Sequence, residues 1–424
     1  MMRATRLHPL TDADHVCPHC RAPLEVKGWH VPGMRNLADL LCGLCGREFY
    51  GDLAAGQALY TPMLLEKAAG VVHDPHGVGW FAGWLRDSYA QRVDEPVPFD
   101  AREARPITRP VVLLNCLDTL YGHSLLKLLN AQYHLDRHGD VDLVVMVPSL
   151  LAWMVPDGVA QVWSVGLPLR RGTEWNEWLA REVRRRVEAF GGASLGHALS
   201  HPRPDEFDIE RFTRVRPFPL DEWDARLARP TVTFIWRDDR PWRAAPGAEP
   251  PTNRERLRRL MTPRSRGGGG QTGLVSELAE ALRRDLPALD FAVAGLAEGV
   301  RRGELPDWVK DLRRPAPDEA CERGWCERYA VSHVVVGVHG SNMLLPSAHA
   351  GAVVELLGAE RWGNFTQDIL FRDDGDCREA FFRYRFVPDA TTPAELARLV
   401  NQMLTRREDF RRLMNVRPAE TEAS

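Results

Sequence analysis

The sequence lacks three features that would each indicate a particular class of protein. No apolar stretch reaches the roughly 20 residues that a membrane-spanning helix needs, so we expect no membrane span. The opening residues, MMRATRLHPLTDADHV, lack the hydrophobic block of a secretory signal. The net charge is only −3 at pH 7, which gives no general attraction to nucleic acid or to an acidic membrane. We therefore expect a cytoplasmic protein whose partners must be inferred from local features.

What the sequence does contain is enough apolar material for a large core. Of the 424 residues, 44% are hydrophobic and 27% are charged, which is typical of globular proteins. A chain of this length has room for roughly two or three domains. Lysine is scarce, and arginine supplies nearly all of the positive charge.

Four of the eight cysteines form two pairs with the spacing of a zinc ribbon. Cys17 and Cys20 belong to CPHC, and Cys42 and Cys45 belong to CGLC. Each C-x2-C pair places two thiolates on one tight turn. Four thiolates fill a tetrahedral Zn²⁺ shell and leave no position for a substrate, so we predict a structural zinc site.

Other interpretations of this segment remain open. The cysteines could form two disulfides, although a chain without a secretory signal meets a reducing environment. His15 and His19 flank the first pair and could compete as ligands, but four cysteines already suffice. Ribbons of this kind also contact other molecules, so a protein partner at the ribbon is a further hypothesis.

Beyond the ribbon, buried apolar runs alternate with helical patterns in two series. The first series has predicted strands at 110–115, 141–148 and 161–166, with helices at 122–135 and 174–190. The second has strands at 231–236, 290–296, 333–338, 352–357 and 381–388, with helices at 272–287, 319–330, 342–350 and 393–410. We expect Thr272 to cap the first of these helices, after a long loop over 237–273 that is rich in proline, arginine and glycine.

Buried strands that alternate with helices indicate parallel sheets covered on both faces. The predicted fold class is therefore α/β, with two Rossmann-like domains after an N-terminal zinc ribbon. The predicted boundaries are a ribbon over 1–50, a connecting region over 51–108, an N-terminal Rossmann-like domain over 109–228, a C-terminal one over 229–392, and a helix and tail over 393–424. In such sheets, ligands bind beyond the carboxyl ends of the strands, and we expect a cleft between the two domains.

Two turns at strand ends of the second series have the composition of an anion site. His339, Gly340, Ser341 and Asn342 leave a buried strand and enter a helix. Glycine permits close backbone approach there, and helix N-termini offer amides to phosphate. Arg237 ends another strand of the same series and could clamp a phosphate, with Arg240 as an alternative clamp. An ordinary turn capped by Ser341 or Asn342, and a solvated salt-bridge cluster with Asp238 and Asp239, are the alternatives.

The first series offers a candidate for proton transfer. Asp118 and His123 follow the strand at 110–115. Imidazole titrates near neutrality, so His123 could take a proton from an incoming hydroxyl, with Asp118 as the second choice. The alternative is that Asp118 caps the helix and His123 packs against it.

The segment VGVHGSNMLL…AGAVVELL resembles the "VGxHGAGLxN…PGxxVVEL" segment of glycosyltransferase family 61. YGHSLLKLLNAQYHL, at 121–135, is similar to that family's "YGHFLxDxLP" helix, and TVTFIWRDDR, at 231–240, is similar to its strand that ends in arginine. These similarities span about residues 110 to 390. The sequence departs from the family at Ser341 and Asn342 and at Ala350.

The resemblance implies a GT-B fold and transfer of a sugar from a nucleotide donor to a hydroxyl, without a metal at the catalytic centre. It implies that the turn at 339–342 and Arg237 hold the nucleotide diphosphate, that Glu355 lies near the donor ribose, and that His123 faces the acceptor. The acceptor could be a glycan, a protein or a small molecule. Two other functions stay open: a nonenzymatic scaffold that engages a partner through its ribbon, and another GT-B-shaped enzyme such as a nucleotide-sugar epimerase.

Overall fold

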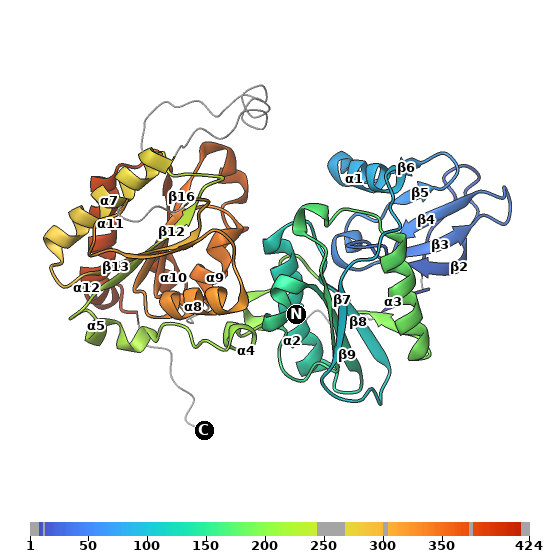
Figure 1. The fold of residues 1–424 in the computed structure, drawn as a ribbon, viewed down its shortest axis with the longest axis horizontal. Coiled ribbons are helices and arrows are strands. Elements are labelled where there is room, and N and C mark those ends of the chain that lie inside the picture. Colours follow the sequence, from blue (N-terminus) through green and yellow to red (C-terminus); the bar gives the residue numbers. More distant parts are fainter. Residues whose placement is uncertain (1–7, 12, 244–267, 300–303, 373–375, 417–424) are drawn as a thin grey trace. The chain divides into compact units, whose positions relative to one another are not determined.

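The computed structural model describes residues 8–11, 13–243, 268–299, 304–372 and 376–416. The chain divides into two compact units, Met1–Phe212 (unit 1) and Thr213–Ser424 (unit 2). The predicted fold class is confirmed: each unit contains a Rossmann-like α/β sheet, and an antiparallel sheet with the four cysteines precedes the first (Figure 1). Among the described helices, none combines the length and the apolar character needed to cross a membrane.

The N-terminal sheet of unit 1 is a five-stranded antiparallel meander. It runs in chain order through β2 (Glu25–His30), β3 (Leu37–Leu41), β4 (Glu48–Asp52), β5 (Leu64–Glu66) and β6 (Val71–His73). Residues 51–108, expected to connect the ribbon to the α/β domain, thus contribute β5 and β6 to this sheet. They also form α1 (Gly79–Ala90) and the edge strand β7 (Phe99–Glu103) of the next sheet. Such short strands form because they pair with neighbouring strands, so their own sequences show only a weak hydrophobic pattern.

The α/β sheet of unit 1 has the strand order β1-β11-β8-β9-β10-β7. Its strands are β1 (His8–Pro9), β8 (Val111–Asn115), β9 (Asp142–Pro148), β10 (Gln161–Val165) and β11 (Ser194–Leu195) with β7, and its long helices are α2 (Tyr121–Arg137) and α3 (Glu177–Ala189). Strands β11, β8, β9 and β10 are parallel, and the two edge strands are antiparallel. Helices α2 and α3 cover opposite faces (Figure 1).

One hydrophobic core joins the antiparallel sheet to the α/β sheet of unit 1. It includes Leu40 and Phe49 from the former, Leu113 and Trp163 from the latter, and Val183 from α3. Asn115, at the end of β8, adds a polar link because its amide nitrogen donates to the Gly33 carbonyl at 2.9 Å. The ribbon is therefore an integral layer of unit 1.

The sheet of unit 2 is entirely parallel, with the order β14-β13-β12-β15-β16-β17. Its strands are β12 (Thr231–Arg237), β13 (Asp290–Leu296), β14 (Lys310–Arg314), β15 (Val334–Val338), β16 (Ala352–Leu357) and β17 (Tyr384–Pro388). Numbered along the chain, this is the 3-2-1-4-5-6 order of a Rossmann fold. The direction of winding reverses between β12 and β15.

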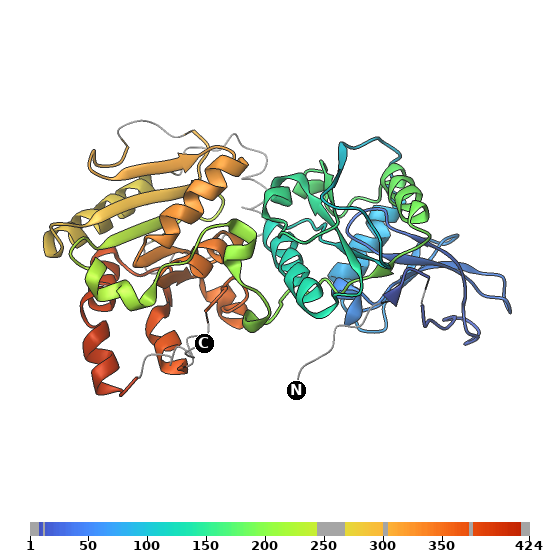
Figure 2. The ribbon, with the colours of Figure 1, turned by 90° about the horizontal axis from the view of Figure 1, so that it is seen from below.

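Helices cover both faces of this sheet. They are α7 (Gly268–Asp285), α8 (Glu319–Ala330), α9 (Leu344–His349), α10 (Cys377–Arg383), α11 (Pro393–Thr405) and α12 (Arg407–Leu413), preceded by the short α5 (Trp223–Arg226). Helix α4 (Ile209–Thr213) lies at the boundary of the two units in the chain. Helices α7 and α11 pack together on one face, and α8 and α9 pack together on the other (Figures 1 and 2).

Three local expectations differ from the structure. Thr272 lies inside α7, which begins at Gly268, so it does not cap that helix. The segment expected to be one helix at 342–350 is a 3-10 turn at Ser341–Met343 followed by the short α9. Strand β14 was not expected, because its sequence KDLRR is mostly charged. Most of the loop expected over 237–273, namely 244–267, lies outside the described residues.

Candidate functional site

The four cysteines lie together, as their spacing predicts. Their sulfur atoms all lie within 4.8 Å of one another, with 3.7 Å between Cys17 and Cys45 and 3.4 Å between Cys20 and Cys42. Zinc–sulfur bonds of about 2.3 Å place the sulfurs of a tetrahedral site roughly 3.8 Å apart. A disulfide would need about 2.05 Å, and all four cysteines are free. The cluster therefore fits a tetrahedral metal ion and does not form the two disulfides considered above.

The two cysteine turns have the same backbone geometry. The Cys17 amide donates to the Ala22 carbonyl, and the Cys42 amide donates to the Arg47 carbonyl. Gly46, directly after the second pair, adopts a positive φ of 71°, which glycine does without a steric penalty. The backbone amide of Cys45 is the largest cause that lowers the pKa of Cys42, to about 6. The backbone amide of Arg47 lowers the pKa of Cys45, on the same turn, but burial and the Cys42 sulfur outweigh it, so that this pKa is instead raised.

In unit 2, the two turns predicted as an anion site meet at the reversal point of the sheet. Strand β12 ends at Arg237, and β15, its hydrogen-bonded neighbour, is followed by His339. In a doubly wound sheet, this is the edge at which ligands bind. The topology therefore brings Arg237 and the turn at 339–342 together, as expected from the sequence.

Two arginine side chains donate hydrogen bonds to this turn, at the His339 carbonyl and at the Asn342 side chain. The Arg237 guanidinium donates from Nη1 to the Asn342 side-chain oxygen at 2.7 Å and to the His339 carbonyl at 3.3 Å, and it also forms an ion pair with Asp239. Arg240 donates to the same His339 carbonyl at 2.7 Å, which is its single hydrogen bond among the described residues. Within the described part of the chain, the other guanidinium donors of Arg240 have no hydrogen-bond partner.

Gly340 makes this approach possible. Its φ is +148°, a conformation adopted almost only by glycine. A Cβ atom at this position would overlap Nη1 of Arg237. The turn is therefore shaped around the arginine.

We expect Gly340→Ala to lower the free energy of unfolding by about 2 kcal/mol, because both the backbone conformation and the arginine must change. Urea unfolding measures the effect. Gly273→Ala is the matched control, since Gly273 lies within α7 and an added methyl group there would meet no atom within 4 Å. Alanine at that position should be neutral or stabilising. Equal stability of Gly340→Ala and the wild type would contradict this account.

The His339 side chain is buried and contacts two carboxyl groups of unit 2. It is 1% exposed, its Nδ1 lies 2.5 Å from Glu355 Oε2, and its Nε2 lies 3.4 Å from Asp368. Burial and then Arg240 lower the pKa of His339 to about 4, whereas burial and then Asp368 raise the pKa of Glu355 well above its ordinary value. Burial thus favours the neutral form of both members of this pair, whose Nδ1 and Oε2 atoms are hydrogen-bonded to each other. Glu355 is fully buried under His339, so the structure does not place it where a ribose could reach it.

Ser341 and Asn342 do not cap the following helix. The 3-10 turn begins after Gly340 without a side-chain cap, and α9 has only six residues. Asn342 instead uses its side-chain oxygen to accept from Arg237. The contribution of this turn to an anion site thus comes from the arginines that it positions and not from a long helix.

Two charged residues near this turn were not predicted. Arg361 lies in a 3-10 helix that follows β16, and Asp368 lies shortly after it. Burial is the largest cause that lowers the pKa of Arg240, followed by the charges of Arg237 and Arg361. Within the described residues, Nε of Arg361 is buried without a hydrogen-bond partner. The charges of Arg237 and Arg361 thus both act on Arg240, against the opposing charges of Asp239 and Asp368.

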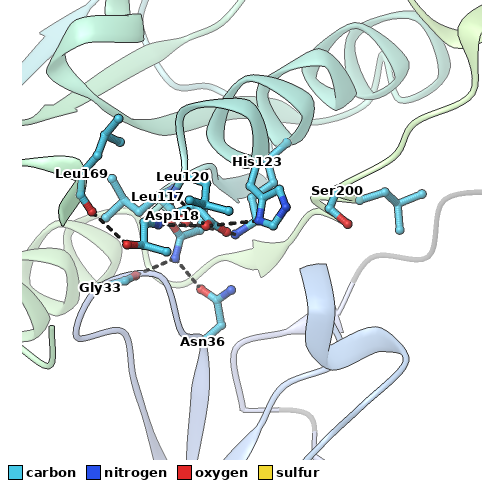
Figure 3. A network of polar contacts seen from close by, with 12 residues as sticks. Gly33, Asn36, Leu117, Asp118, Leu120, His123, Leu169 and Ser200 are labelled. Carbon is cyan, nitrogen blue, oxygen red and sulfur yellow. Dashed lines mark hydrogen bonds and ion pairs between the residues drawn. The ribbon is translucent and has the colours of Figure 1, made fainter. Parts of the chain in front are cut away.

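In unit 1, Asp118 is the centre of a buried polar network after β8 (Figure 3). Its carboxylate accepts from the amides of Thr119 at 2.8 Å and Leu120 at 3.2 Å and from Lys127 Nζ at 2.7 Å. Burial would raise the pKa of Asp118, but Lys127 and His123 outweigh it and hold the pKa well below its ordinary value. Asp118 is thus an ionised, fully engaged carboxylate.

His123 lies on the first turn of α2 beside this carboxylate. Its Nδ1 is 3.4 Å from Asp118 Oδ1, and its side chain keeps 15% of its surface exposed. Among the described residues this Nδ1 has no hydrogen-bond partner, so its contact with Asp118 is electrostatic; a histidine beside a buried carboxylate can still exchange a proton. The site also lies where the strand order of this sheet reverses, between β8 and β11.

Comparisons with known proteins give no family assignment. No family model and no curated protein matches the sequence. Among solved structures, the chain is similar to E. coli ADP-heptose LPS heptosyltransferase II, with 13% identity and a TM-score of 0.37, over 71% of this chain and 100% of that one. It is also similar to the E. coli heptosyltransferase WaaC with ADP, with 13% identity and a TM-score of 0.38, over 72% of this chain and 100% of that one. Membership of family 61 stays a prediction.

Proposed function

We propose that the protein is a glycosyltransferase and that unit 2 holds the diphosphate of its nucleotide-sugar donor. The observation that carries this proposal is the gathering of Arg237, Arg240 and Arg361 at the reversal point of a Rossmann sheet, around a glycine turn that fits them. Glu355 is neutral there, so Asp239 and Asp368 are the nearby carboxylates. Three arginines against these two carboxylates leave the cluster with a net positive charge, which favours an anion such as a diphosphate.

In the proposed reaction, the acceptor hydroxyl oxygen attacks the anomeric carbon of the donor sugar. The bond between that carbon and the diphosphate oxygen breaks, and the electron pair leaves with the nucleoside diphosphate. The arginines stabilise the negative charge that develops on this leaving group. Within unit 1, His123 is the candidate base for the hydroxyl proton, with Asp118 beside it and not itself accepting the proton. The arginines provide the positive charge for which other enzymes use a metal ion.

We also propose that Cys17, Cys20, Cys42 and Cys45 hold a structural zinc ion. The four sulfurs fill a tetrahedral shell, and Cys17 and Cys42 are fully buried within the core of unit 1. Zinc there would fix the two cysteine turns relative to each other and would leave no coordination position for a substrate.

The donor site is tested by Arg240→Ala. A charge-assisted hydrogen bond contributes about 1.5–3 kcal/mol, so we expect the affinity for ADP or UDP to fall roughly ten- to hundredfold. Isothermal calorimetry measures it, after a thermal-shift screen has identified the preferred nucleoside diphosphate. Arg361→Ala should weaken binding in the same range.

Arg412→Ala is the matched control, because Arg412 is exposed in unit 2 and pairs with Asp409. Unchanged affinity in both Arg240→Ala and Arg361→Ala would overturn the donor-site assignment. A wild-type protein that binds no nucleoside diphosphate or nucleotide sugar would favour the scaffold alternative. If a nucleotide sugar binds, product analysis with and without an acceptor separates transfer from epimerisation.

A further inference from the structure

A second cluster of metal-binding side chains lies beside the cysteines in unit 1. It consists of His19, Glu66 and His73, whose nearest ligand atoms all lie within 4.8 Å of one another. His19 is part of the first cysteine turn, whereas Glu66 ends β5 and His73 ends β6. Three chain segments thus direct side chains of ligating type to one point.

Strand pairing explains why two of these groups meet. In the β5–β6 hairpin, Leu64 is paired with His73 and Glu66 with Val71. Side chains of paired residues, and of residues two apart, lie on the same face of a sheet. Glu66 and His73 are therefore on one face, and Phe49, paired with Glu66 from β4, lies on that face as well.

The distances suit a small transition-metal ion. His19 Nε2 lies 2.9 Å and His73 Nε2 lies 3.7 Å from the same Glu66 oxygen, Oε2. Metal–ligand bonds of about 2.0–2.1 Å place the ligand atoms of a tetrahedral site roughly 3.3 Å apart. The two observed distances lie on either side of this value, so an ion could be held with small adjustments of the side chains.

The residues around His19, Glu66 and His73 hold these side chains in place for a metal ion. Arg47 forms an ion pair with the other Glu66 oxygen, Oε1, and thus orients the carboxylate as partners of ligating carboxylates commonly do. Nε2 of His73 is buried without a hydrogen-bond partner in the described part of the chain. The ring centroids of His19 and His73 each lie 6.3 Å from that of Phe49, which is fully buried beneath them.

We propose that His19, Glu66 and His73 form a second metal site, separate from the cysteine cluster. Two imidazoles and one carboxylate favour zinc or a similar transition-metal ion over magnesium or calcium. The three ligands leave one position open, and the His19 side chain is 36% exposed, so that position would hold water or an external ligand. The cysteine cluster, in contrast, is closed.

The experiment is metal stoichiometry of the full-length protein, loaded with zinc and then dialysed. We expect two zinc ions per chain in the wild type, one in His73→Ala and two in the matched control His76→Ala, whose exposed histidine lies outside the cluster. Cobalt loading identifies which site is lost. His73→Ala should keep the thiolate-to-cobalt charge-transfer bands and lose the weaker bands of the nitrogen–oxygen site.

One zinc ion per chain in the wild type, with cobalt spectra of thiolate type only, would overturn the proposal and leave His19, Glu66 and Arg47 as an ion-pair cluster. Equal metal content in His73→Ala and the wild type would overturn it as well. His19→Ala is an independent second variant in case His73→Ala does not fold, which circular dichroism reports. Neither outcome depends on nucleotide binding or on glycosyl transfer.

Discussion

Cys42→Ser is expected to abolish metal binding by the cysteine cluster and to destabilise unit 1 more than any other single change considered for this protein. Structural zinc contributes about 10–16 kcal/mol in zinc-finger peptides, which equals or exceeds the stability of a typical domain, about 5–15 kcal/mol. Cys42 is fully buried in the core that joins the antiparallel sheet to the α/β sheet. Without the metal, the thiols of Cys17, Cys20 and Cys45 would remain crowded beside the new hydroxyl group, with Cys17 buried in that core.

We expect the free energy of unfolding of unit 1 to fall by at least about 4 kcal/mol, which for a unit of this size corresponds to a loss of roughly 10 °C in Tm. Elemental analysis measures the zinc, and hydrogen exchange followed by mass spectrometry measures stability separately in peptides of each unit. Exchange should rise across unit 1 and not in unit 2.

Cys377→Ser is the matched control, because Cys377 is an exposed free cysteine outside the cluster. It should retain full zinc content and wild-type exchange. A Cys42→Ser protein that loses its zinc yet keeps wild-type protection in unit 1 would show that the metal is not structural. A wild-type protein without zinc after loading would contradict the zinc proposal itself.

The central strands were predictable because burial on both faces leaves a continuous apolar run. VVLLN of β8 and VVVGV of β15 are fully buried, as their sequences indicate. Edge strands carry no such run. Strand β14, with the sequence KDLRR, and β7, with FDARE, are largely polar and are ordered by pairing with β13 and β10. Whether such a strand forms depends on a partner strand elsewhere in the sequence, so the local sequence pattern does not predict it.

The candidate site could be predicted in part for the same reason. Arg237 and the turn at 339–342 follow buried strands directly, and the parallel topology brings such positions together. Arg361 and Asp368 lie beyond a third strand, in a stretch without a period. The position of Arg361 shortly after AVVELL was the available signal. The buried contact between His339 and Glu355 follows from the pairing of β15 with β16, which places Gly337 opposite Glu355, and no property of either residue alone indicates it.

A buried histidine makes unit 2 sensitive to acid. His333 is 1% exposed; its Nδ1 accepts from the Thr231 amide at 3.2 Å, and its Nε2 donates to the Trp223 carbonyl at 3.3 Å. These bonds require the neutral ring. Burial is the main cause that lowers the pKa of His333 to about 4, against the opposing influence of the Trp223 carbonyl. The ordinary pKa of histidine, about 6.5, applies in the unfolded chain.

Between pH 6.5 and 4 the unfolded state therefore binds a proton at His333 that the folded state does not, and stability must fall as the pH falls. His339, with a pKa of about 4, also lowers the stability as the pH falls. Glu355 has the opposite effect on stability, because its pKa is raised. Above about pH 4.5, the unfolded Glu355 loses a proton that the folded state keeps. The two members of this pair thus act in opposite directions between pH 4.5 and 6.5, and Asp389, whose pKa is raised chiefly by burial, also opposes His333.

We expect the free energy of unfolding of unit 2 to fall by about 3 kcal/mol from pH 6.5 to pH 4 through His333, at about 1.4 kcal/mol per pKa unit. Urea unfolding at a series of pH values measures it. His333→Gln should be less stable at pH 7, because an uncharged amide replaces only part of the hydrogen bonding, yet its stability should be nearly independent of pH between 6.5 and 4.5. His76→Gln, which changes an exposed histidine, should keep the wild-type slope. The same slope in His333→Gln as in the wild type would show that another group controls the acid response.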